Sequence, residues 1–381
     1  RTQPVVFSEA DKRTLFFANN YLWKTTDGGI TWTRISDDPT RKAHDAPSSI
    51  GIYATEAKPQ LENNQARVIY TIGPSPLDVN RIWIGTDDAV IKTTADGGKT
   101  WSDVTPPQLG AYWKVFMIDA GRFDTRTAYA AVNTLRVDDM RPYAYKTHDA
   151  GKTWTLITTG MEDGGAVNAV REDPNFFFKD TAATEKGVYV SFDDGAHWQS
   201  LRLNLPASSV RDLIVKDDDV AVATHGRGFW ILDDVTPLRQ MTPVTADADV
   251  TLFAPAAAWR VRWNTSTDMP WPKDEPTMPN PPEAAPINFH LKGNASGPVT
   301  LDITTADGKL VRHYSSADPL PAVPDNATAT VPVYWYRVPK GLPATAGMHR
   351  FYWDLRYQPA EAAAGGRGDG AGPLLPGMAP I

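Results

Sequence analysis

The chain has 381 residues, and at roughly 150 residues per domain this length predicts two or three domains. Its 38 Lys and Arg against 45 Asp and Glu give a net charge of −7, which argues against the basic face that a nucleic-acid partner requires. A hydrophobic fraction of 41% is enough for buried cores and excludes wholesale disorder. No run approaches the roughly 18 consecutive apolar residues of a membrane span, so the sequence predicts no transmembrane segment.

Cysteine is absent, which excludes a thiol nucleophile, a Cys-ligated zinc and a disulfide framework. The 28 Gly and 32 Pro are typical of short strands joined by tight turns. The 7 His are scattered without the close pairs of a metal site, and Asp217–Asp219 is more typical of a charged turn than of a Ca²⁺ site. We therefore expect no metal and no cofactor.

One eight-residue pattern, Ser/Thr-x-Asp-x-Gly-x-x-Trp, occurs four times. Its aspartates are 69, 53 and 44 residues apart (96 − 27, 149 − 96 and 193 − 149). Each copy stands between two alternating runs, so each predicts the tip of a β-hairpin. The aspartate, glycine and tryptophan of the four copies are Asp27, Gly29 and Trp32; Asp96, Gly98 and Trp101; Asp149, Gly151 and Trp154; and Asp193, Gly195 and Trp198.

The residue types of this pattern point to structure rather than to catalysis. The glycine allows a positive φ, and the aspartate carboxylate can accept hydrogen bonds from turn amides. The tryptophan can bury a large face beneath the hairpin or against the next unit. We expect all four tryptophans to be largely buried and all four aspartates to be bonded to turn amides on an outer rim.

Further alternating runs complete five units, near residues 4–35, 66–105, 112–158, 165–202 and 208–235, of which the fifth lacks the pattern. Four strands per unit is the blade pattern of a β-propeller. The sequence therefore predicts an all-β fold with five propeller blades over residues 1–240. Five blades leave open sheet edges, so we expect further blades of a longer precursor, or a protein partner, to cover them.

The composition changes after residue 240. Residues 241–286 form an expected linker in which seven prolines lie between Pro270 and Pro286. Residues 287–358 alternate again and predict a small immunoglobulin-like or fibronectin-like β-sandwich. Residues 359–381 are rich in Gly, Pro and Ala, and predict a flexible tail.

The order of repeat, Ala223–Asp234 segment, proline-rich linker and sandwich resembles that of large bacterial sortilin-like proteins with WD40/YVTN/BNR-type (Asp-box) repeats. Such proteins are often labelled glycosyl hydrolases on the repeat alone. The resemblance covers roughly residues 1–358 and implies a β-propeller in a secreted, periplasmic or cell-envelope protein. Because these relatives usually extend further on the N-terminal side, the resemblance implies the C-terminal part of a longer chain.

His225 and Arg227 lie in a Gly-rich run similar to one in a terminal blade of xyloglucanase-type propellers. In one interpretation, Arg227 contacts a carboxylated ligand or a sugar. The other, which we favour, is a Gly-rich crossing with Arg227 paired to a neighbouring blade. The aromatic residues Tyr112, Trp113 and Phe176–Phe178 have the same two interpretations, as a binding platform or as core, and we favour core.

A glycosidase needs two carboxylates across the scissile bond. The candidates are two pairs in expected loops beside blade strands, Asp87 with Asp88 and Asp138 with Asp139. The Arg-Ile-Pro motif of sialidases is absent. We therefore expect an extracytoplasmic binding or assembly module without its own catalysis, with a protein partner and possible carbohydrate binding. The alternative is a xyloglucanase-like or sialidase-like glycoside hydrolase with part of its active site in an N-terminal region outside this chain.

Overall fold

The computed structural model describes residues 3–41, 67–176, 179–258, 284–320 and 340–357. Its regular structure is nearly all β, with 40% strand and 5% helix, as the sequence predicts. The chain divides into two compact units, Arg1–Asp233 (unit 1) and Asp234–Ile381 (unit 2). No helix among the described residues has the length and apolar character needed to cross a membrane.

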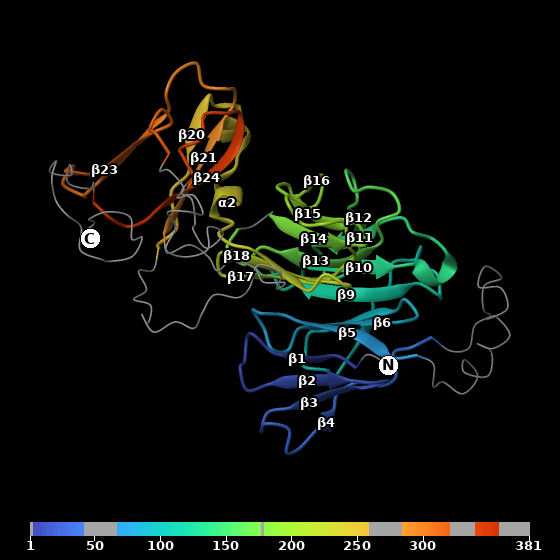
Figure 1. The fold of residues 1–381 in the computed structure, drawn as a ribbon. Helices are drawn as coiled ribbons and strands as arrows, with labels where there is room; N and C mark the ends of the chain where they lie inside the picture. Colours follow the sequence, from blue (N-terminus) through green and yellow to red (C-terminus); the bar gives the residue numbers. More distant parts are fainter. Residues whose placement is uncertain (1–2, 42–66, 177–178, 259–283, 321–339, 358–381) are drawn as a thin grey trace, which may run out of the picture. The chain divides into compact units, whose positions relative to one another are not determined.

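Unit 1 contains four four-stranded antiparallel sheets in which consecutive strands pair (Figure 1). Each sheet corresponds to one predicted repeat unit and has a short outer strand of two or three residues. We number the sheets in chain order. Their strands are β1 (Val5–Phe7), β2 (Leu15–Ala18), β3 (Leu22–Thr25) and β4 (Thr33–Arg34) in sheet 1; β5 (Ile69–Pro74), β6 (Ile82–Thr86), β7 (Ile91–Thr94) and β8 (Ser102–Asp103) in sheet 2; β9 (Lys114–Ala120), β10 (Ala128–Asn133), β11 (Tyr143–Thr147) and β12 (Thr155–Leu156) in sheet 3; and β13 (Val167–Glu172), β14 (Asp180–Thr184), β15 (Gly187–Ser191) and β16 (Trp198–Ser200) in sheet 4.

Sheet 5 differs from the other four in having three strands among the described residues: β17 (Val210–Lys216), β18 (Asp219–Thr224) and β19 (Phe229–Leu232). The difference has a local cause, because the repeat motif that forms the hairpin between the third and outer strands of the other sheets is missing here. The chain continues instead into a short helix of unit 2, α2 (Thr236–Gln240), which has a proline in its first turn.

The first strands of neighbouring sheets, from β1 through β5, β9 and β13 to β17, contact one another in chain order. Because consecutive strands of each sheet run in opposite directions, the loops of unit 1 gather at two opposite ends of the strands, here called the linker end and the motif end. The linker end carries the turns between second and third strands and the segments that join successive sheets. The motif end carries the turns between first and second strands and the four repeat motifs.

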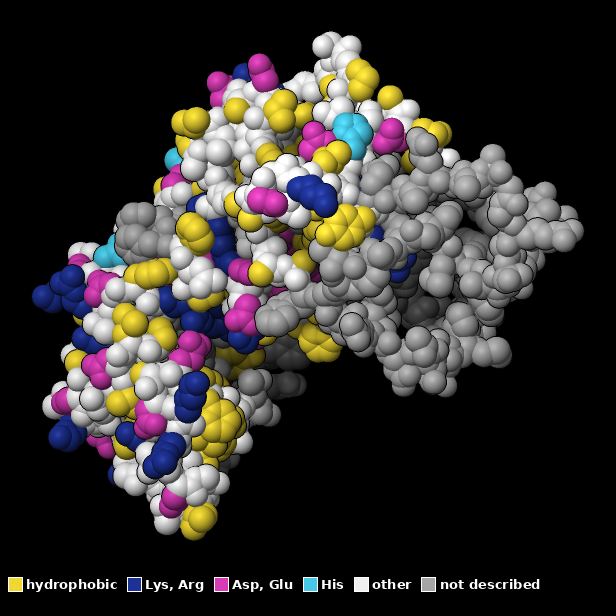
Figure 2. Space-filling view, turned by 90° about the vertical axis from the view of Figure 1, so that its left-hand side faces the viewer, with side chains coloured by type: hydrophobic (Ala, Val, Ile, Leu, Met, Phe, Trp, Pro, Cys, Tyr) yellow, Lys and Arg dark blue, Asp and Glu magenta, His cyan; other side chains and the backbone are white. Residues whose placement is uncertain are grey.

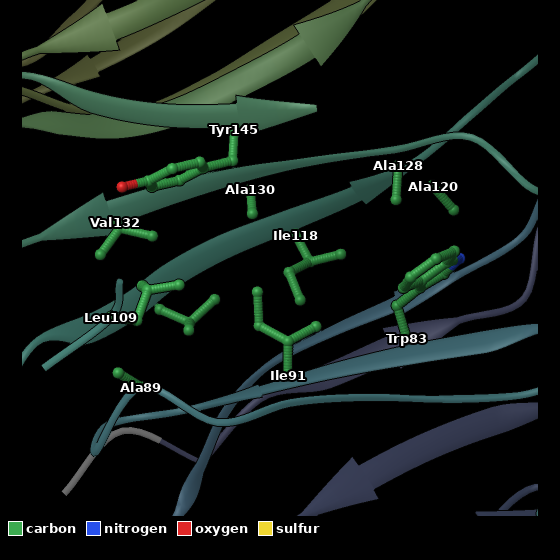
Figure 3. Close-up of a cluster of buried hydrophobic side chains, with 11 residues drawn as sticks. Trp83, Ala89, Ile91, Leu109, Ile118, Ala120, Ala128, Ala130, Val132 and Tyr145 are labelled. Atoms are coloured by element: carbon green, nitrogen blue, oxygen red, sulfur yellow. The ribbon is translucent and has the colours of Figure 1, made fainter. Parts of the chain in front are cut away.

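Hydrophobic cores lie between the sheets, and the two-residue period of the strands fills them. On β10, Ala128, Ala130 and Val132 face the core shared with sheet 2, whereas Tyr129 and Ala131 face the core shared with sheet 4. Figure 3 shows the first of these cores, with Trp83 and Ile91 from sheet 2 pointing toward Ile118, Ala130 and Val132 of sheet 3. Because both faces of sheets 2 and 3 are covered, their second strands, β6 and β10, are buried along their whole length.

Unit 2 contains α2, α3 (Pro243–Asp247), a three-stranded sheet and a two-stranded sheet. The strands are β20 (Val250–Leu252), β21 (Ala285–Leu291) and β24 (Gly347–Trp353) in the first, and β22 (Thr300–Thr304) and β23 (Leu310–Ser315) in the second. Val250–Leu252, within the expected linker, pairs with β21 and is therefore part of a sheet. The proline-rich run from Pro270 to Pro282, residues 321–339 of the expected sandwich and the tail over 359–381 lie outside the described residues. The immunoglobulin-like sandwich remains a prediction.

Candidate functional site

The four repeat motifs form one hydrogen-bonded turn four times. In the second copy, the Thr94 hydroxyl accepts the Gly98 amide at 3.0 Å and donates to the Asp96 carboxylate at 2.8 Å. Asp96 also accepts the amide and the hydroxyl of Thr100, at 2.9 and 2.6 Å. These bonds, led by the Thr100 hydroxyl, hold the pKa of Asp96 well below its ordinary range, so the carboxylate stays ionised. Equivalent bonds hold Asp27, Asp149 and Asp193.

The tryptophan of a motif joins its sheet to the preceding one. The indole Nε1 of Trp101 donates to the Ile35 carbonyl oxygen at 2.8 Å, that of Trp154 to Val104 at 2.8 Å, and that of Trp198 to Ile157 at 2.9 Å. Each acceptor is the residue that follows the outer strand of the preceding sheet.

The motif glycine makes this approach possible, since a Cβ on Gly98 would lie only 2.6 Å from the Ile35 carbonyl oxygen. A Cβ on Gly151 would lie 2.6 Å from Val104 Cβ, and one on Gly195 would lie 2.8 Å from Ile157 Cδ1. We call the set of Trp donor, Gly and aliphatic acceptor a seam.

The prediction that all four tryptophans are largely buried is wrong for Trp32. This residue is 38% exposed, whereas Trp198 is 3% exposed and Trp101 and Trp154 are half-buried. The Trp32 Nε1 donates to the Gly29 carbonyl oxygen of its own turn, at 3.1 Å. Among the described residues no sheet precedes sheet 1, so no outer-strand carbonyl meets this indole.

The carboxylates of Asp87 and Asp88 lie at the linker end of sheet 2, and both are buried. Asp87 accepts the Val68 amide at 2.9 Å and pairs with the Arg136 guanidinium at 3.4 Å. Asp88 accepts the Thr86 hydroxyl and the Arg41 amide, and its carboxylate lies 3.8 Å from Arg67 Nε. Burial raises the pKa of Asp88. Both groups are therefore built into contacts between chain segments.

The second candidate pair lies in the turn between β10 and β11. Asp138 is exposed and has a positive φ of 58°, which places it at the end of a short 3₁₀ turn. Asp139 accepts two bonds from the Arg141 guanidinium, at 3.0 and 2.7 Å, and one from the Tyr143 hydroxyl at 2.8 Å. The Arg141 bonds hold the pKa of Asp139 well below its ordinary range, so it is an ionised acceptor and not a general acid.

His225 and Arg227 lie in the turn between β18 and β19, and both side chains are exposed. A nitrogen of His225 lies 3.4 Å from the Arg211 guanidinium of the same sheet. The Arg227 backbone closes the turn, since its amide donates to the Thr224 hydroxyl and its carbonyl accepts the Trp230 indole.

The remaining sequence candidates are the acidic turn at Asp217 and the aromatic residues Trp113 and Phe176, and each contacts a neighbouring side chain. In the turn at Asp217, the carboxylate pairs with Lys216 at 2.7 Å, and the described residues contain no group of three or more His, Asp or Glu able to hold a metal ion. Trp113 contacts Tyr143 in a tilted arrangement with ring centroids 4.7 Å apart, and the Lys179 ammonium lies 5.2 Å from the centroid of the Phe176 ring. Phe177 and Phe178 lie outside the described residues.

The structure also reveals a cluster that the sequence reasoning missed. The Lys114 ammonium, at the start of β9, lies 4.3 Å from the ring centroid of Tyr70 on β5 and 6.0 Å from that of Phe116. Burial, together with the positive charges of Arg136 and Arg211, lowers the pKa of Lys114 to about 8. The signal in the sequence was a lysine opening an apolar inner strand, without any sign of which aromatic ring it meets.

The surface carries both charges. Figure 2 shows one face of the molecule, on which Lys and Arg side chains lie beside Asp and Glu side chains and are interrupted by hydrophobic ones. Opposite charges are thus mixed on this face rather than separated into patches of one sign.

No protein-family model and no curated protein matches the chain. Three similar solved structures are YCF48 bound to D1 peptide (18% identity, covering 61% of this chain and 65% of that one, TM-score 0.39), the GH74 xyloglucanase of Xanthomonas campestris (16%, 62% and 37%, 0.43) and an ancestral GH74 enzyme (12%, 83% and 38%, 0.47). The chain spans less than two thirds of the length of each. A propeller from Myceliophteria thermophila Cps50 (Swd1) is also similar (10% identity, 60% and 64%, TM-score 0.42). The neighbours are β-propeller proteins.

Proposed function

We propose that the chain is an extracytoplasmic β-propeller module for binding and assembly, without a catalytic centre of its own. The observation that carries this proposal is the state of the candidate acids. Asp87 and Asp88 are buried in contacts between segments, and Asp139 is held ionised by Arg141. None of these three carboxylates is arranged as a free proton donor opposite a second carboxylate.

The relationship to sortilin-like Asp-box proteins belongs to the same proposal. It is supported by the repeated turn geometry, in which each Ser/Thr-x-Asp-x-Gly-x-x-Trp copy forms the same bonds. The resemblance to such proteins implies that this chain is secreted, periplasmic or part of the cell envelope, and the absence of cysteine is compatible with these locations. Residues 287–358 are proposed as a sandwich that follows the blades.

The binding part of the function is assigned to the linker end of unit 1. There, the Lys114 ammonium and the rings of Tyr70 and Phe116 come from two sheets and remain half-buried. A cation beside aromatic faces is suited to contact a carboxylate or a sugar ring. A protein or carbohydrate partner is therefore proposed, and no nucleic acid.

The test is a hydrolysis screen of the full chain on soluble β-glucans and sialosides. The proposal expects no turnover above that of a buffer control. Turnover that disappears in Asp87→Asn or Asp139→Asn, with the melting temperature unchanged, would establish the glycoside hydrolase alternative. Arg126→Gln, at the motif end, is the matched control for a change of surface charge.

A further inference from the structure

The first strands of sheets 2 to 5 share an irregularity near the linker end. In each sheet, two consecutive residues of the second strand pair with two first-strand residues that have one extra residue between them. Such a β-bulge leaves the extra residue out of the ladder and redirects its side chain. The four bulged residues, here called the bulge row, are Tyr70 on β5, Phe116 on β9, Asn168 on β13 and Arg211 on β17.

The bulges are placed alike in all four sheets. Each lies across from a second-strand position that carries a small residue, Gly85, Ala131, Ala183 or Ala223. The first strands are edge strands that contact one another in chain order (Figure 1), so the bulge row runs from sheet to sheet. Bulges concentrate at sheet edges and beside active sites, where they re-aim side chains. Their recurrence therefore points to a role of this edge beyond the packing of any one sheet.

The first two members of the bulge row hold a cation that lacks an anionic partner. The rings of Tyr70 and Phe116 have centroids 5.4 Å apart, and the Lys114 ammonium lies over both. Lys114 is half-buried and makes no hydrogen bond or ion pair with any described residue. Asp87, the acidic group that acts on its charge, is itself paired with Arg136 at 3.4 Å. A half-buried cation without a counter-ion favours the binding of an anion from outside the chain.

The last two members of the bulge row place a second cation. The Asn168 side chain is fully buried and donates to the Glu185 carboxylate and the Val210 carbonyl oxygen, both at 2.9 Å. The same carboxylate accepts the Arg211 guanidinium at 2.8 Å. Arg211 is half-buried, and a guanidinium has five N–H donors, so donors remain for a ligand. Its charge contributes to the lowered pKa of Lys114, so the two cations lie within electrostatic reach of each other.

We propose that the bulge row, together with Lys114, binds an acidic polysaccharide of the uronate class. Carboxylates of the sugar chain pair with Lys114 and Arg211, and a sugar ring lies against the two aromatic members of the row. The inference rests on the proposed function, which assigns binding to the linker end of unit 1, and it names the class of ligand.

The edge geometry favours a saccharide over an acidic peptide. An extended peptide adds to a free sheet edge through main-chain hydrogen bonds. Here the bulges interrupt that edge in all four sheets, so recognition is left to side chains. Lys114 and Arg211 lie on first strands that are separated by β13, so each meets its own anionic group. A chain of singly charged carboxylates matches this arrangement.

The experiment is a calorimetric titration of the full chain with oligomers of galacturonate, glucuronate and mannuronate, and with their methyl esters. We expect at least one acidic oligomer to bind, with an affinity that falls about tenfold or more on esterification and also falls with added salt. Binding of none of the three, or equal binding of acid and ester, overturns the proposal. Penta-glutamate is the peptide arm, and tighter binding of this peptide would overturn it in favour of a protein partner.

Variants locate the binding. Lys114→Met and Arg211→Gln are each expected to lower the affinity about tenfold. Arg126→Gln, at the motif end, is the matched control and is expected to leave it unchanged. Equal effects of all three variants would contradict the proposed site.

A second measurement needs no variant. In the wild-type chain, the acidic oligomer is expected to raise the NMR titration midpoint of ¹³C-methylated Lys114 from about 8, because a bound carboxylate favours the ammonium, whereas the ester leaves it in place. A midpoint unmoved at saturation overturns the proposal. The length of the oligomers is checked in the same samples. Their hydrolysis would refute the proposed function, whereas missing binding refutes this inference, so the two fail separately.

Discussion

Glu172 on β13 and Asp180 on β14 lie directly opposite each other, and both residues are 1% exposed. Glu172 Oε2 accepts the Arg122 amide at 2.6 Å, while its Oε1 and both carboxylate oxygens of Asp180 have no hydrogen-bond partner among the described residues. Burial raises the pKa of Glu172 to about 7, and burial together with the nearby carboxylates of Asp194 and Glu172 raises that of Asp180. This pair therefore retains protons that exposed carboxyl groups have lost.

The first prediction is that Glu172→Gln stabilises the protein at alkaline pH. The pKa of Glu172 in the folded chain exceeds its ordinary value of 4.5, so ionisation lowers the stability as the pH rises from 4.5 to about 7. Glutamine keeps an acceptor for Arg122 and carries no charge. We expect a gain of about 1–3 kcal/mol near pH 8 and little gain near pH 4, measured by urea unfolding. An equal gain at both pH values would contradict the assignment.

The second prediction concerns the titration of Lys114. Because burial and the charge of Arg136 lower its pKa to about 8, the neutral amine is favoured and stability rises as the pH increases from about 8 toward 10.5. Arg136→Gln removes one of the positive charges, so the midpoint in an NMR titration of ¹³C-methylated lysines is expected to move upward. Arg126→Gln, a surface variant at the motif end, is expected to leave the midpoint near 8. A midpoint unaffected by Arg136→Gln would exclude this electrostatic coupling.

The third prediction compares two seam positions. Trp198→Ala removes a buried indole and its bond to Ile157, and we expect a loss of about 3–5 kcal/mol in the free energy of unfolding. Trp32→Ala removes a partly exposed side chain bonded only to its own turn, and we expect a loss below about 1.5 kcal/mol. Equilibrium urea unfolding measures both. Similar losses would show that the turn, and not the contact between sheets, determines the cost.

The fourth prediction tests the close approach of sheets 2 and 3. A Cβ on Gly85 would lie 2.4 Å from Val115 Cγ1, so Gly85→Ala is expected to cost about 1–3 kcal/mol by overpacking. Val115→Ala in the same chain makes room, and the double variant is expected to be more stable than the sum of the two single changes implies. Gly293→Ala, in open space, serves as the control. If the free-energy changes of the two single variants simply added in the double variant, the strain of Gly85→Ala would not arise from its contact with Val115.

Much of unit 1 was predictable because the repeat fixes local geometry. The units predicted near residues 112–158 and 165–202 contain sheets 3 and 4. The motif turn was accessible to sequence reasoning because its donors and acceptors lie within about one turn of each other. The exposure of Trp32 was not predictable in this way, since it depends on a neighbouring sheet and not on the motif itself.

The candidate site was less predictable, because its contacts join distant segments. Asp87 was proposed from its neighbour Asp88, but its partner Arg136 is 49 residues away in the next sheet. Lys114 and Tyr70 likewise come from different sheets, and the alternation of β9 does not tell which inner strand lies beside it. Pairings of this kind follow from the order and spacing of the sheets, which no local pattern contains.

The seams between sheets also determine how unit 1 comes apart. Each of the three bonded indoles connects its sheet only to the preceding sheet, so mechanical or thermal unfolding of unit 1 can proceed one sheet at a time. The same arrangement permits change of length, since duplicating a whole sheet leaves every distant seam intact and alters only the contacts at its two flanks.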